Sequence, residues 1–135
     1  MDTRLGHLQV NVAADNLAFY RDLFAFLEWP VIYDGDGTLG VSSQDGAGAW
    51  FVGGANDHTN DYDGVGLNHF AIAAGSQADV DATVAYIQSN GVAALFETPR
   101  HRPDFAQSEA DTYYQVMFES PDRILFEVVY TGPKQ

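Results

Sequence analysis

Polar and apolar residues alternate in two short segments that lie about half a chain length apart. The first is residues 5–12 and the second is residues 67–73, and each carries a histidine at its third position, His7 and His69. Alternation with a period of two is typical of a β-strand with one buried face. The pattern therefore predicts two similar halves that each begin with a strand.

A helical pattern follows each of these strands. In the first half, Asp15 or Asn16 is the expected N-cap of a helix that ends before Pro30. In the second half, Ser76 with Asp79 three residues later resembles a capping box, and apolar residues then recur at helical spacing. Both halves thus continue from a strand into an amphipathic helix.

Short apolar segments between turn signals predict three more strands after each helix. They are expected near residues 31–33, 38–41 and 49–52 in the first half, and near residues 93–96, 112–118 and 124–130 in the second. The predicted fold class is α+β, with two βαβββ modules that form a cupped mixed sheet with the helices on its outer face. We expect the first module at residues 1–56, a linker at 57–63 and the second module at 64–132, folded together as one domain.

One connection in the second half is unusually long. Residues 97–111 show no periodicity and contain two prolines, and irregular connections of this length in compact domains tend to be functional lids or disordered. The segment also holds Arg100, His101 and Arg102. These side chains either form an anion-binding lid over the sheet or are solvated charges that pair with acidic neighbours.

The composition excludes several classes of function. The 135 residues include six Lys and Arg against 19 Asp and Glu, for a formal net charge of −13, and no cysteine. A chain this acidic would be repelled by phosphate backbones, so we expect no nucleic-acid partner. We expect no membrane association and a cytoplasmic location, because no apolar run approaches the roughly 20 residues that span a bilayer and the N-terminus does not resemble a signal peptide. The lack of cysteine excludes disulfides, thiolate nucleophiles and cysteine-bound metal.

Three side chains on the predicted strands are candidates for a metal site. Alternation places His7 and His69 on the strand faces opposite those that the helices cover. Glu127 is the only acid in the apolar run at residues 124–130, and a carboxylate there is costly unless it is paired or bound to a metal. Two imidazoles and a carboxylate suit a divalent first-row ion with open positions for water or substrate. The alternative is a hydrogen-bonded cluster that lines a pocket without metal.

The hairpin before Glu127 decides which side chains surround the carboxylate. A three-residue loop at 121–123 pairs Met117 with Glu127 and places Tyr113 and Gln115 on the same face. A two-residue loop would instead place the alternate, apolar residues of that strand beside the carboxylate. We favour the three-residue loop because polar neighbours suit a carboxylate better.

These considerations define a set of candidate substrate-binding residues. Trp50 lies on the last strand of the first half, where it is either a core residue or part of a pocket wall. The full set consists of Trp50, Tyr113, Gln115, Met117, Arg100 and His101. The sequence assigns no catalytic residue.

The paired modules with a histidine early in each resemble the vicinal oxygen chelate superfamily, which includes glyoxalase I, extradiol dioxygenases, fosfomycin-resistance enzymes and bleomycin-binding proteins. Residues 19–24 are similar to the "FYRDLLGF" helix of that group, and residues 113–127 resemble its "YYxVxFxDPDGxxxE" ending. The resemblance implies metal ligands at His7, His69 and Glu127. It also implies a cupped sheet built from one chain or from modules exchanged between two chains, and a homodimer.

Two positions depart from the pattern of the family. In glyoxalase I the last strand of the first module supplies a fourth ligand, usually Glu, but residues 49–52 contain no carboxylate. This departure argues against conversion of a glutathione hemithioacetal. Arg123 stands where the family usually has Gly, so it must adopt a left-handed conformation at a cost of roughly 1–2 kcal/mol, or the turn must change.

The resemblance implies one function and leaves others open. The first is a divalent-metal-dependent enzyme, a glyoxalase-like lyase or isomerase or a dioxygenase, that acts on a small molecule with adjacent oxygens; Mn, Fe, Zn and Ni are all compatible with the ligands. The second is a metal-free protein that binds and sequesters a small molecule, like bleomycin-resistance proteins. The third is an oligomerising domain without chemistry, which would have no enclosed pocket beside the two histidines.

Overall fold

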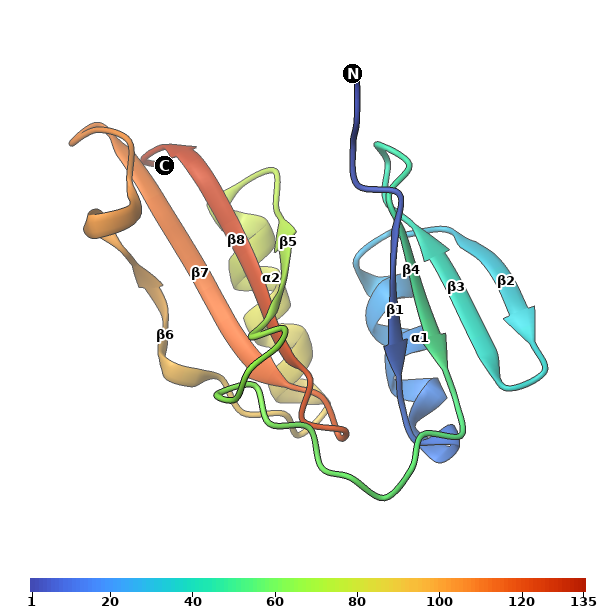
Figure 1. Ribbon diagram of the computed structural model, residues 1–135. Helices are drawn as coiled ribbons and strands as arrows, with labels where there is room; N and C mark the ends of the chain where they lie inside the picture. The colour runs from blue at the N-terminus through green and yellow to red at the C-terminus, as the bar shows by residue number, and fades with distance from the viewer. The chain divides into compact units, whose positions relative to one another are not determined.

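The computed structural model describes all 135 residues and divides the chain into two compact units, Met1–Thr59 and Asn60–Gln135. Each unit contains one four-stranded mixed sheet and one α-helix (Figure 1). In each unit a strand leads into the helix, and three further strands follow it. The predicted α+β class with two βαβββ modules is confirmed. Neither helix has the length and apolar character that crossing a membrane requires.

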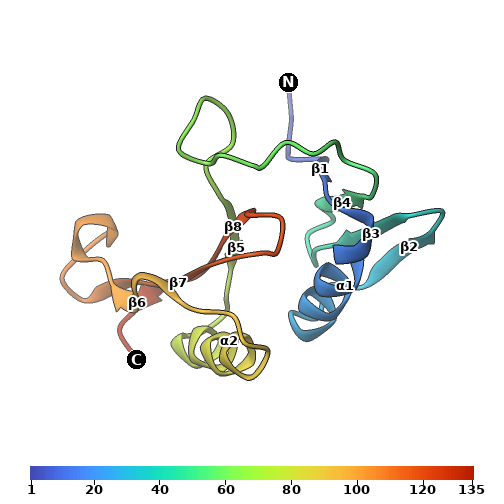
Figure 2. The same cartoon turned by 90° about the horizontal axis from the view of Figure 1, so that it is seen from below.

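The first unit follows the predicted order of elements. Its elements are β1 (His7–Asn11), a 3-10 turn η1 (Ala14–Asn16), α1 (Leu17–Phe26), β2 (Val31–Gly35), β3 (Thr38–Ser42) and β4 (Gly48–Val52). The strands lie in the order β1-β4-β3-β2, with β1 parallel to β4 and the other pairs antiparallel. The helix covers one face of this sheet (Figure 2).

Aromatic packing fills the space between α1 and its sheet. Tyr20 and Phe24 of α1 are fully buried, and both contact Phe51 of β4, with ring centroids 4.4 Å and 5.2 Å apart. Burial of such aromatic side chains dominates the energetics of a small core. The opposite face of the sheet carries the exposed His7, as the alternation predicts.

The second unit repeats this arrangement. Its elements are β5 (Phe70–Ala73), α2 (Gln77–Ser89), β6 (Leu95–His101), a 3-10 turn η2 (Pro103–Phe105), β7 (Asp111–Glu119) and β8 (Leu125–Pro133). The strand order is β5-β8-β7-β6, with β5 parallel to β8. Ser76 caps α2 as predicted, because its Oγ accepts a hydrogen bond from the backbone N–H of Asp79 at 3.1 Å.

The long connection of the second half is more regular than predicted. Residues 97–101, expected in an irregular segment, belong to the edge strand β6, in which Arg100 pairs with Gln115 and His101 with Tyr114 of β7. The register shifts between Leu95 and Arg100, and two residues in that interval have positive φ, 55° and 59°. These distortions break the alternation that sequence analysis relies on. An edge strand also tolerates Pro99, because one side of its backbone needs no hydrogen-bond donor.

The segment that precedes β5 packs against the second unit. Tyr62, which sequence analysis places in a polar linker, is only 8% exposed. Its hydroxyl donates a hydrogen bond to Glu119 of β7, and the side-chain amide of Asn60 donates to the backbone carbonyl of Arg123 at 2.9 Å. The second compact unit therefore begins at Asn60, and the residues that lead into β5 are fixed on the β7–β8 hairpin.

Candidate functional site

The hairpin between β7 and β8 sets the surroundings of Glu127. Met117 pairs with Glu127 across the two strands, and the backbone N–H of Ser120 donates to the carbonyl of Ile124 at 2.9 Å. This confirms the predicted three-residue loop. Arg123 adopts the left-handed conformation, with a φ of 57°, so the turn keeps its geometry without glycine.

Glu127 is a buried carboxylate with a partner on each oxygen. The residue is 2% exposed and is the third residue of β8. Its Oε1 accepts a hydrogen bond from the hydroxyl of Tyr113 at 2.8 Å, and its Oε2 lies 3.0 Å from Nε2 of His69. A buried carboxylate requires such partners, because desolvation of an unpaired charge costs several kcal/mol.

His69 lies immediately before β5 and is oriented by Asn68. The side-chain nitrogen of Asn68 donates to the backbone carbonyl of Tyr62 at 2.7 Å, and a carbonyl only accepts, which fixes which end of the amide is oxygen. The Oδ1 of Asn68 then faces Nδ1 of His69 at 2.7 Å, so Nδ1 carries the hydrogen. The lone pair of neutral His69 is therefore on Nε2 and is directed at Glu127.

Tyr113 supplies a neutral donor to this carboxylate. Burial, followed by the hydrogen bond to Glu127 and the charge of Glu127, raises the pKa of Tyr113 from 10 to about 12. The phenol therefore keeps its proton throughout the neutral range. Its ring packs edge-on against the ring of Phe105 of η2 with centroids 5.4 Å apart. The guanidinium of Arg102 lies over the same Phe105 ring, 4.3 Å from its centroid. Sequence analysis did not select Phe105, and only its aromatic character next to the arginines could have suggested this contact.

The remaining candidates on β7 and β6 divide between the two faces of the sheet. Tyr113, Gln115 and Met117 alternate along β7 and share the face of Glu127, as the three-residue loop requires. Arg100 pairs with Gln115 and therefore belongs to the same face. Its Nε is buried without a hydrogen-bond partner, while one of its terminal nitrogens lies 3.4 Å from Glu97.

His101 lies on the opposite face, apart from Glu127. Neighbouring residues in a strand point to opposite sides, and the ring of His101 packs against Tyr114 with centroids 4.6 Å apart. Tyr114 in turn donates a hydrogen bond to Asp81 of α2 at 2.7 Å. The structure therefore does not combine Arg100 and His101 into one lid over the carboxylate.

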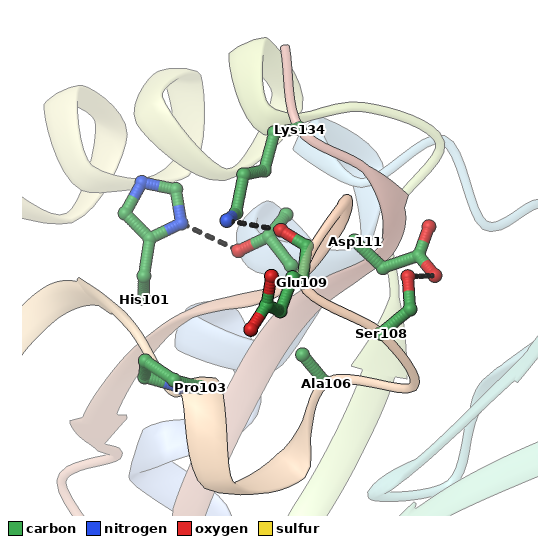
Figure 3. A pocket seen from close by; sticks show the side chains of 8 residues that line it. His101, Pro103, Ala106, Ser108, Glu109, Asp111 and Lys134 are labelled. Atoms are coloured by element: carbon green, nitrogen blue, oxygen red, sulfur yellow. Dashed lines mark hydrogen bonds between the residues drawn. The ribbon is translucent and has the colours of Figure 1, made fainter.

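A cavity of about 480 Å³ opens beside His101 (Figure 3). Its lining consists of His101, Pro103, Ala106, Ser108, Glu109, Asp111, Thr112 and Lys134. None of the side chains around Glu127 belongs to this lining, so the cavity is separate from the His69–Glu127 pair.

The first unit presents Trp50 on the sheet face that α1 leaves uncovered. Across the sheet, Gln9 of β1, Trp50 of β4 and Gly40 of β3 are direct neighbours. A Cβ atom on Gly40 would lie 2.8 Å from the indole ring, so the ring of Trp50 lies directly over the glycine. Trp50 is a surface-facing residue of the sheet rather than a core residue.

The registers of the two units identify equivalent positions. Gln9 pairs with Trp50 in the first unit, and Ala71 pairs with Glu127 in the second. His7 lies two residues before Gln9, and His69 lies two residues before Ala71, so the two histidines occupy equivalent positions. Trp50 therefore occupies, in the first module, the position that Glu127 occupies in the second. Trp50 lies on β4, the strand predicted at residues 49–52, which contains no carboxylate.

Within the second unit, His69 and Glu127 form a pair, and no third His, Asp or Glu joins them closely enough to complete a metal site.

A duplicated βαβββ module with a histidine at the start of each copy and a buried glutamate on the last strand defines a protein of the vicinal oxygen chelate class.

The chain belongs to the Glyoxalase/Bleomycin resistance protein/Dioxygenase superfamily, whose family model matches residues 4–128. The resemblance found in the sequence is thereby confirmed. A search of curated proteins found no match.

Solved structures agree with this assignment. A candidate glyoxalase from Bacillus halodurans is 25% identical, with a TM-score of 0.76 over 93% of this chain and 94% of that one. The fosfomycin resistance protein FosX from Listeria monocytogenes, complexed with Mn(II) and sulfate, is 20% identical, with a TM-score of 0.70 over 98% and 93%. The oxidase ChaP-H2 is 19% identical, with a TM-score of 0.67 over 100% and 98%. The likenesses to FosX and ChaP-H2 concern the fold alone.

Proposed function

We propose that this protein is a divalent-metal-dependent enzyme that acts on a small molecule with two adjacent oxygens. His69 and Glu127 hold the ion, together with His7, which is the equivalent residue of the first module. The observation that carries the proposal is the contact between Nε2 of His69 and Oε2 of Glu127 at 3.0 Å. FosX, which shares the fold, holds Mn(II) in its structure.

The chemistry of this contact fits a cation. Because Nδ1 of His69 carries the hydrogen that Asn68 accepts, Nε2 and the carboxylate oxygen face each other as two lone-pair donors. They stay at 3.0 Å only if a proton or a metal ion is shared between them. A metal-ligating histidine normally donates its other ring N–H to an oxygen acceptor, and Asn68 is such an acceptor.

The spacing of the donors also fits. Nε2 of His69 and Oε2 of Glu127 lie 3.0 Å apart, which is the distance of an N–H···O hydrogen bond and is also short enough for both atoms to contact one ion. Nitrogen and carboxylate donors together are compatible with Mn, Fe, Zn or Ni, so the donor set does not select one metal.

The side chains around the pair have distinct roles in this proposal. A bound divalent ion supplies a Lewis acid for the two substrate oxygens. The phenol of Tyr113 holds Oε1 of Glu127 by its hydrogen bond at 2.8 Å and leaves Oε2 to the ion. Met117, directly across from Glu127, provides an apolar wall, and Gln115 and Arg100 on the same face are the polar groups that contact the substrate. A homodimer is part of the proposal.

A metal-free binding protein is the second candidate. The observation that favours it is that Tyr113 and a protonated His69 would satisfy both oxygens of Glu127 without a metal. In that case the buried pair is structural, and the sheet faces bind a small molecule without chemistry.

Metal binding separates the two candidates. Wild-type protein, Glu127→Gln, His69→Ala and His7→Ala are purified, and bound Mn(II), Fe(II), Zn(II) and Ni(II) are measured by elemental analysis and calorimetric titration. The enzyme proposal expects one ion per chain in the wild type and none in the three variants. His101→Ala is the matched control, because it removes a histidine from the other face of the second unit, and it should bind metal like the wild type.

The opposite pattern would refute the enzyme. If the wild type binds no divalent ion with a dissociation constant below the millimolar range, or if His69→Ala binds as well as the wild type, the pair is not a metal site. If His69→Ala and Glu127→Gln lose metal but His7→Ala does not, the metal site is supported and His7 is not one of its ligands.

A further inference from the structure

The indole of Trp50 lies flat against the sheet because residue 40 has no side chain. A Cβ at Gly40 would lie 2.8 Å, 2.9 Å and 3.0 Å from three carbons of the six-membered ring. Real Cβ atoms do not approach other atoms this closely, so only glycine allows the ring to rest on the backbone of β3. One π face of Trp50 therefore covers the strand, and the other is directed away from the sheet.

This ring forms one part of a continuous aromatic surface. The ring of Tyr33 on β2 lies 6.0 Å from that of Trp50 at an interplanar angle of 38°, and Tyr33 is 42% exposed. At the other end, the Cβ position of Gly48 lies 3.4 Å from the indole nitrogen and 3.2 Å from Cβ of His7. The aromatic surface thus begins beside His7 and extends over Gly40 to Tyr33.

The row across the sheet carries no charge. Its members are Gln9, Trp50, Gly40 and Tyr33, all of them neutral. In a protein with a net charge of −13, a neutral, flat and partly exposed aromatic surface suits an uncharged planar ring better than an anion. Offset stacking on an indole favours a planar ring, since a saturated ring cannot bring all its atoms to the same distance from the indole plane.

We infer that Trp50 stacks against a planar aromatic or heteroaromatic ring of the substrate, with Gly40 as the positioning residue that keeps the indole flat. This rests on the proposed function, because the adjacent oxygens of that substrate are the groups that a metal at His7 would meet. Trp50 then binds the substrate ring from the strand position of the first module that is equivalent to Glu127 in the second.

A pair of probes isolates the contribution of planarity. Catechol and cis-cyclohexane-1,2-diol both carry two adjacent hydroxyls on a six-membered ring, but only catechol is flat; its phenols are also more acidic, so planarity is compared in metal-free protein. Binding of both is measured by Trp50 fluorescence in a Trp29→Phe background and by calorimetry, once in EDTA-treated protein and once with added Mn(II). In EDTA-treated protein we expect catechol to bind at least about fivefold more tightly than the diol, as expected for an aromatic stacking contact; with Mn(II) the preference also includes the stronger chelation by catechol.

Variants test the two residues separately. Trp50→Leu should abolish the preference for the planar probe, measured by calorimetry, and Trp50→Phe should retain part of it. Gly40→Ala should reduce the preference while Trp50 is still present, because the added methyl displaces the indole. Gly6→Ala is the control, since a Cβ there meets no atom within 4 Å, and it should behave like the wild type.

The outcomes distinguish this inference from the proposed function. Equal preference in the wild type and Trp50→Leu, or an unchanged preference in Gly40→Ala, overturns the stacking role. A preference that depends on Trp50 and Gly40 in EDTA-treated protein supports it even if no metal binds. Circular dichroism spectra establish that each variant is folded, and Gly40→Ala retains a decisive test if Trp50→Leu is not.

Discussion

Replacement of Asn68 by alanine tests the orientation of His69 most directly. Asn68 makes two hydrogen bonds of 2.7 Å, one to the ring Nδ1 of His69 and one from its amide nitrogen to the carbonyl of Tyr62. Removal of an oxygen acceptor behind a metal-ligating histidine lowers metal affinity about 10- to 100-fold. We expect Asn68→Ala to weaken Mn(II) or Zn(II) binding by that factor, because the imidazole loses both its fixed tautomer and its fixed orientation.

Aspartate at the same position separates the two bonds. Asn68→Asp keeps an oxygen for Nδ1 of His69 but replaces the donor to the Tyr62 carbonyl with a second oxygen, which this carbonyl repels. Its metal affinity should fall less than that of Asn68→Ala, since a carboxylate partner increases the basicity of the imidazole. Calorimetric titration with a competing chelator measures the metal affinity of the wild type, Asn68→Ala and Asn68→Asp. Equal affinity of Asn68→Ala and the wild type would show that His69 is not a ligand oriented by this amide.

Three further predictions concern the same unit. Glu127→Gln should leave the metal-free protein folded, because a glutamine amide can donate to the lone pair on Nε2 of His69; a drop of several kcal/mol in its free energy of unfolding would instead indicate a structural ion pair. The raised pKa of Tyr113, about 12 against 10, means that its contribution to stability is present below pH 10 and is lost as the pH rises to 12. Tyr113→Phe should therefore show a smaller loss of stability in urea denaturation over that interval, and an identical loss would contradict the assignment. Ser76→Ala should lower the free energy of unfolding by about 1 kcal/mol through loss of the α2 cap, as urea denaturation can measure.

Local patterns were sufficient to predict the elements around Glu127. The alternation in residues 124–130 and the three-residue turn determine which side chains of β7 share its face, and both depend only on neighbours in sequence. Strand β6 could not be predicted in the same way. Phe96 and Glu97 have positive φ, and two such residues break the period of two by which a strand is recognised.

The support of His69 could not be predicted because it comes from outside any regular element. Asn68 precedes β5, and Tyr62 lies in a stretch so rich in Asp and Asn that it resembles a solvated linker. Its burial results from the hydrogen bond to Glu119 and from packing of the Arg123 guanidinium over its ring at 5.4 Å. These are contacts across more than 50 residues, and no periodicity encodes them.

The two modules share a backbone register but differ in what the equivalent strand position can hold. A carboxylate at the Glu127 position is stable because Tyr113 donates to one oxygen and His69 faces the other. In the first module the equivalent position faces outward, and the hydroxyl of Tyr33, the neighbouring side chain on that face, already donates to Asp36 at 3.2 Å. Gly40 leaves room there for the indole of Trp50 to lie against the strand. The same register position therefore holds an acid with two partners in one module and a flat aromatic ring in the other.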